Sequence, residues 1–127
     1  MSKKQDYKFY NVRAAAILTG SYVAGTVIEE THNLNQLIIY ADFTVGELTD
    51  CDIKVEFSPD NNSFYQDSSE AIASGESTVS AKHYTLSATG KYRLALPIKD
   101  RYIKISATGN GTVTSSSLTI DAVVGIA

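Results

Sequence analysis

Residues 51–65, CDIKVEFSPDNNSFY, decide the fold class. From Cys51 to Phe57 the odd-numbered residues are apolar and the even-numbered ones are polar, and this period of two predicts a β-strand with one buried face. The segment 58–62, SPDNN, predicts a turn, because proline presets φ while aspartate and asparagine bond to their own backbone and tolerate left-handed conformations. The chain returns at Phe64 and Tyr65. The stretch therefore predicts two antiparallel strands at a corner of a sheet.

The same alternation recurs along the chain. Residues 36–45 are the most apolar segment, with residues 37, 39, 41 and 43 in one phase and Ile38 and Tyr40 in the other, which predicts a central strand. Residues 92–98 alternate up to Pro97, which places the end of that strand at an edge or a bulge. Residues 103–107 and 118–124 alternate as well, with Lys104 and Ser106 expected to face water.

Other segments are less regular. Residues 7–18 start aromatic and predict a strand that ends at the turn 19–21; both of its faces are apolar from residue 12 to 18, which suggests cover by a neighbouring subunit. Residues 22–29 resume a β-branched pattern. Residues 66–81 are rich in Ser, Ala, Glu and Gly and predict a long surface loop with a short strand near 78–81. Residues 109–111, GNG, predict a hairpin.

Together these segments predict an all-β protein. About eight to nine strands at hairpin spacing, with no helix predicted, indicate an antiparallel β-sandwich with jelly-roll or immunoglobulin-like Greek-key topology. At 127 residues the chain fits one domain. We expect a flexible N-terminal arm over residues 1–6 and a single β-sandwich domain over residues 7–127.

Composition excludes several classes of function. A single cysteine, Cys51, cannot form an internal disulfide, and its apolar phase predicts burial. The N-terminus lacks the pattern of a secretory signal, and no apolar run approaches the ~20 residues that a membrane span needs, so we expect synthesis in the cytoplasm and no membrane partner. A net charge of −3 argues against nucleic acid as a partner.

Charge is unevenly distributed along the chain. Acids dominate residues 42–70 and bases dominate residues 76–127, which would suit head-to-tail packing of copies if the two halves formed opposite ends of the domain. Two ordinary solvated faces are the alternative.

No catalytic, cofactor-binding or metal-binding residues are predicted. His32 and His83 lack the spacing of zinc ligands, and no Gly-x-Ser-x-Gly motif occurs. Acids such as Asp50, Asp52 and Asp60 lack an EF-hand pattern, so a solvated acidic face is the preferred interpretation. The sequence thus predicts a protein that is not an enzyme and needs no cofactor.

Aromatic residues provide the candidate contacts. The rings of Phe64, Tyr65, Tyr84 and Tyr102 could serve as a platform for sugars. The aromatic cluster at the N-terminus lies next to basic residues and is predicted to anchor the chain on another subunit. These predicted partner-contact residues are Lys3, Lys4, Tyr7, Phe9 and Tyr10.

Three stretches carry a resemblance to a known family. Residues 53–65, together with residues 90–97, GKYRLALP, and residues 101–112, RYIKISATGNGT, resemble small virion structural proteins of tailed bacteriophages, over about residues 37–124. The resemblance implies a sandwich protein that works by assembly: a capsid decoration (auxiliary) protein or a head–tail or tail component, located in the virion, binding other virion proteins and forming a homo-oligomer. The VEFSxD corner is also similar to discoidin-type domains. The alternative is therefore a carbohydrate-binding module that recognises a host glycan.

Overall fold

The computed structural model describes residues 8–29, 31 and 34–126. The expected arm, residues 1–6, lies outside this part of the chain, as do Tyr7 and His32. Within it the chain forms strands and no helix, so the predicted all-β class is confirmed. The strands are β1 Lys8–Ala16, β2 Val23–Ala24, β3 Gln36–Thr44, β4 Leu48–Ser58, β5 Tyr65–Gln66, β6 Ser68–Ala73, β7 Glu76–Ala81, β8 His83–Leu86, β9 Gly90–Pro97, β10 Tyr102–Gly111 and β11 Ser117–Gly125.

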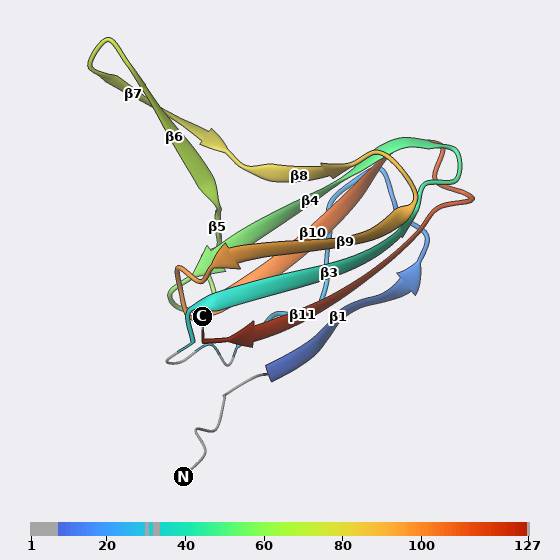
Figure 1. Cartoon of the computed structure of the whole chain (residues 1–127), viewed down its shortest axis with the longest axis horizontal. Helices are drawn as coiled ribbons and strands as arrows, with labels where there is room; N and C mark the ends of the chain where they lie inside the picture. Colours follow the sequence, from blue (N-terminus) through green and yellow to red (C-terminus); the bar gives the residue numbers. More distant parts are fainter. Residues whose placement is uncertain (1–7, 30, 32–33, 127) are drawn as a thin grey trace.

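The strands form a sandwich of two sheets and a separate hairpin (Figure 1). The four-stranded sheet has the order β1-β11-β3-β9, and the five-stranded sheet has the order β2-β10-β4, with β5 and β8 both paired to β4. Strands β1, β3, β9 and β11 thus alternate along the chain with β2, β4, β8 and β10 of the opposite sheet, and all pairings are antiparallel. Of the two predicted topologies, this is the jelly roll.

The core forms where the predicted apolar phases of the two sheets face each other. The odd-numbered residues of β4 from Cys51 to Phe57 and the predicted phase of β3 are buried, and the central position of β3 and the edge position of β9 are confirmed. Apolar side chains fill the space between the sheets because each strand presents every second residue inward. The buried core includes Leu37, Ile39, Ala41, Phe43, Cys51, Ile53, Val55, Phe57, Ile103, Ile105, Ala107, Leu118, Ile120, Ala122 and Val124.

The segment before β3 covers part of the five-stranded sheet, which corrects two predictions. The strand expected over residues 22–29 is reduced to β2 and an isolated bridge between Ile28 and Ile103. Ser106, expected to face water, is buried, and it lies in the sheet between Ala24 of β2 and Lys54 of β4. Its neighbour Thr108 is also buried and donates a hydrogen bond of 3.2 Å to the carbonyl oxygen of Thr19.

The hairpin predicted at residues 109–111 is wrong. Strand β10 continues through this segment to Gly111, and the next strand, β11, belongs to the opposite sheet. Gly109 serves close packing instead, since a Cβ atom there would lie 3.1 Å from side-chain atoms of Leu18 and Leu48. The chain turns after β10, where the amide of Ser116 donates to the carbonyl oxygen of Val113 at 3.0 Å.

The long loop predicted over residues 66–81 is also wrong, although its short strand near residue 78 exists within β7. Strands β6 and β7 form a hairpin with a tight turn at Ser74 and Gly75, whose φ angles are 52° and 75°. Figure 1 shows that this β6–β7 hairpin projects away from the sandwich. All residues of both strands are exposed, so their composition resembles that of a loop. The sequence therefore shows no alternating apolar pattern that would predict the two strands.

Acidic and basic segments do not occupy opposite ends of the domain. Strands from the acidic half pair directly with strands from the basic half, which places Asp42 opposite Lys91 and Glu56 opposite Lys104. Opposite charges therefore mix across the sheets, and charge polarity does not define a direction of assembly.

Among the described residues, no helix is of the length and apolarity that a membrane span requires.

Candidate functional site

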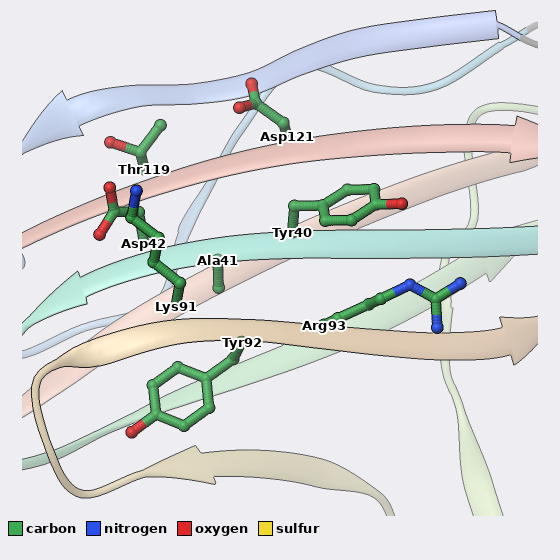
Figure 2. A pocket seen from close by; sticks show the side chains of 8 residues that line it. All are labelled: Tyr40, Ala41, Asp42, Lys91, Tyr92, Arg93, Thr119 and Asp121. Atoms are coloured by element: carbon green, nitrogen blue, oxygen red, sulfur yellow. The ribbon is translucent and has the colours of Figure 1, made fainter.

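The outer face of the four-stranded sheet carries a shallow hollow. Leu37 and every second residue after it in β3 point into the core, so Tyr40 and Asp42 point outward. The register places Tyr40 between Arg93 of β9 and Asp121 of β11. Asp42 lies in the same way between Lys91 and Thr119. Figure 2 shows these side chains along three neighbouring strands, with the Tyr40 ring and the Arg93 guanidinium extending in the same direction. Charged groups of both signs thus line this half of the face.

The other half of this face is apolar. The register aligns Phe9 of β1, Val123 of β11, Ile38 of β3 and Ala95 of β9 in one row across all four strands, here named the apolar row. Phe9 is 68% exposed, Ala95 is exposed, and Ile38 and Val123 are half-buried. Residues on the solvent-facing side of an antiparallel sheet are normally polar. A continuous apolar row on this side therefore marks a surface suited to contact with another molecule.

The predicted partner-contact residues fall into three groups. Phe9 belongs to the apolar row. Tyr10 has the opposite phase, lies opposite Ala122 and packs half-buried against the core. Lys3, Lys4 and Tyr7 lie outside the described residues. The alternation of residues 92–98 and 118–124 left Ala95 and Val123 in the outward phase, and the apolar second phase of residues 36–45 pointed to Ile38, but sequence reasoning did not connect these residues with Phe9.

The β6–β7 hairpin is a second exposed apolar surface. Cross-strand pairing sets Glu70 opposite Val79 and Ile72 opposite Ser77, so Ile72, Val79 and Glu70 share one face, and Thr78 lies on the other. Ile72 is 71% exposed and Val79 is 67% exposed. Two apolar side chains therefore project from one face of a polar hairpin into solvent.

The base of the hairpin is fixed to the sandwich by Asp67. Its amide donates to the carbonyl oxygen of Val55 at 2.8 Å, and its own carbonyl oxygen accepts from the amide of Lys82 at 2.8 Å. Its buried carboxylate accepts a charged hydrogen bond of 2.5 Å from Nζ of Lys99. Since both ends of the hairpin meet at this residue, the hairpin leaves the body in a defined direction.

The outer face of the five-stranded sheet holds a hydrogen-bond network. Asn110 donates from Nδ2 to Asp50 Oδ1 at 2.5 Å and to Asp52 Oδ2 at 3.1 Å, and Thr85 donates to Asp52 Oδ1 at 2.6 Å. Nε2 of His83 lies 3.9 Å from the same oxygen of Asp52. The acids are thus held by neighbouring side chains, and the described part of the chain contains no group of three side chains suited to a metal ion.

The remaining candidates for chemistry are also engaged in structure. Cys51 is fully buried, and burial together with the carboxylates of Asp52 and Asp50 raises the pKa of its thiol to about 12, so it stays a neutral thiol at neutral pH. Of the rings considered for sugar binding, Tyr84 packs against the core and Phe64 is covered by Nζ of Lys104 at 4.1 Å. Tyr65 is 64% exposed beside the base of the hairpin.

Comparison with known proteins adds a likeness in fold. No protein-family model and no curated protein matches the chain. Among solved structures, the chain is similar to the crystal structure of the SPBc2 prophage-derived protein YomS, with a TM-score of 0.58 and 12% sequence identity. The match covers 98% of this chain and 97% of that one. At this identity the likeness shows a shared fold over essentially the whole length of both chains.

Proposed function

We propose that the chain is a non-enzymatic structural component of a bacteriophage virion that acts by protein–protein assembly. A capsid decoration (auxiliary) protein or a head–tail or tail component fits best. The observation that carries the proposal is the apolar row, a contact surface on a face that ordinarily meets water. The prophage origin named for a protein of the same fold supports the phage setting.

The free energy gained by covering the exposed apolar side chains supports assembly as the role of this face. Covering one Phe or Ile side chain contributes about 1.5–3 kcal/mol. Phe9 of this face and Ile72 of the hairpin, which are 68% and 71% exposed, can each contribute toward this range when a partner covers them, and the half-buried Ile38 contributes less. In a symmetric particle the contact repeats with each copy. Many weak, repeated contacts suit a component that binds only in the presence of its particle.

Particle composition tests the proposal. Phage particles are purified on a density gradient from induced cells that carry the gene, and the chain is quantified by mass spectrometry. We expect a copy number fixed relative to a major particle protein. A chain that is abundant in the lysate and missing from the particles would contradict a virion role.

A matched pair of variants ties the particle result to the apolar row. Phe9→Asp places a charge in the row, and we expect it to fold and to be depleted from particles. Val23→Asp is the control, because Val23 is also apolar and 48% exposed and lies on the opposite sheet. Equal incorporation of both variants would show that the row makes no particle contact.

Glycan recognition is the second candidate, favoured by the ring of Tyr40 in the hollow of the four-stranded sheet. A glycan array with the intact chain tests it. Binding that Tyr40→Ala abolishes would replace the structural proposal with a carbohydrate-binding module, while an array without hits supports the assembly role.

A further inference from the structure

We infer that the β6–β7 hairpin of one copy binds the outer face of the four-stranded sheet of a second copy, where Ile72 and Val79 cover the apolar row. This inference rests on the proposed assembly function and names its partner. It makes the chain both donor and acceptor of the same contact.

The contact must join different copies because of where the hairpin begins. Both of its flanking strands, β5 and β8, pair with β4 of the five-stranded sheet. The apolar row lies on the outer face of the opposite sheet, and Figure 1 shows the hairpin extending away from the body. A hairpin fixed at Asp67 in this direction meets a neighbour and not its own row.

The two surfaces match in size. The row crosses four strands, so it is about 14 Å long at the usual strand spacing. Ile72 and Val79 are diagonal neighbours across the hairpin, which separates them by about 7 Å. Both apolar side chains therefore fit within the length of one row.

The two surfaces also match in charge. Glu70 shares the hairpin face with Ile72 and Val79, and the hairpin carries a second acid, Glu76, and no base. On the acceptor, the exposed bases Lys91 and Arg93 lie on the edge strand β9, with Arg93 two residues from Ala95 of the row. The acids of that face lie on the inner strands: Asp42 lies opposite Lys91, and Asp121 accepts a hydrogen bond of 2.8 Å from Asn11. An acidic hairpin approaching across β9 thus meets bases first.

The expected assembly is head-to-tail and weak for a single contact. Different surfaces meet on the two copies, so the contact is heterologous and continues into a ring or a chain of copies. A hairpin of two six-residue strands, about 20 Å long and 10 Å wide, covers about 200 Å² of its partner, well below the ~800 Å² per partner of a stable interface. We therefore expect association near millimolar concentrations or on a particle that holds the copies together.

Cross-linking of two single-site variants tests the contact. Ile72→Cys and Phe9→Cys are purified separately, mixed at up to about 1 mM and oxidised mildly, and the disulfide-linked dimer is followed on non-reducing gels. The native Cys51 is fully buried and does not interfere. Thr78→Cys mixed with Phe9→Cys is the control, since Thr78 lies on the opposite face of the same hairpin.

We expect the Ile72→Cys and Phe9→Cys mixture to cross-link about tenfold faster than the control mixture and faster than either variant alone. Equal rates in all mixtures overturn the inference. Fastest cross-linking of Ile72→Cys with itself also overturns it, in favour of a symmetric hairpin–hairpin contact.

Charge reversal provides an independent readout. Glu70→Arg and Arg93→Glu should each slow the specific cross-link when introduced into the donor and the acceptor respectively, and the combination of both should restore it. Failure of the combination to restore the rate contradicts this docking.

Particle purification separates this inference from the proposed function: a chain that is present in particles without the cross-link refutes only the hairpin contact, and a chain absent from particles refutes the virion role itself.

Discussion

Raising the pH to about 10 should destabilise the fold through one buried thiol. Cys51 is fully buried in β4, and the pKa of its thiol is raised from 9.0 to about 12, first by burial and then by the carboxylate of Asp52. Because the pKa of the thiol is higher in the folded state, the neutral thiol contributes fully to the stability of the fold below pH 9. This contribution is lost as the pH rises from 9 toward 12. At about pH 10 the thiol is mostly ionised in the unfolded chain and neutral in the folded chain. This difference lowers the free energy of unfolding by about 1.4 kcal/mol.

Urea unfolding of the wild type and of Cys51→Ala, at neutral pH and at about pH 10, isolates this contribution. Other groups that titrate in this range are shared by both proteins, so the wild type should lose about 1.4 kcal/mol more than the variant between the two pH values, a tenfold difference in the unfolding constant. Equal losses in the two proteins would refute the reasoning, because they would show that the Cys51 thiol ionises as easily in the folded chain as in the unfolded one.

Three further predictions concern packing and the hairpin. Gly25→Ala should lower the melting temperature strongly, since its Cβ atom would lie 2.3 Å from a carbonyl oxygen of β1; near-wild-type melting would contradict this. Phe43→Ala should cost about 3–5 kcal/mol in urea unfolding, because the ring is fully buried, and a loss below 1 kcal/mol would indicate a relaxed core. Replacing residues 68–81 by Asn-Gly should leave the melting temperature of the body within a few degrees, because Asp67 and Lys82 are already joined by a hydrogen bond of 2.8 Å; unfolding of the shortened chain would show that the hairpin is part of the core.

Sequence patterns predicted local features well and long-range placement poorly. The period of two identified the buried faces of β3, β4 and β11, and turn chemistry identified the corner at Asp60, whose Oδ1 accepts from the amides of Asn62 and Ser63 at 2.9 and 3.0 Å. The hairpin over residues 68–81 was missed because both of its faces are exposed, so no hydrophobic period marks it. The turn predicted at Gly109 failed because glycine also serves close packing, which depends on Leu18 and Leu48 far away in the chain.

The candidate site was predictable only in part. Phe9 stood out as an aromatic residue beside a basic segment, but its role depends on Val123, Ile38 and Ala95, which come from three other strands. Nothing in the local pattern of β9 or β11 indicates that these residues meet.

By itself the sequence determined the strands that have one buried apolar face, among them β3, β4 and β11, and the sandwich class, because the alternation of side chains is a property of each strand alone. The tertiary structure alone decided which strands share a sheet, where the hairpin projects and which outward residues align into the apolar row. The reason is physical: the register between strands distant in the chain follows from how the whole core packs, and a one-residue shift would send each of those side chains to the opposite face.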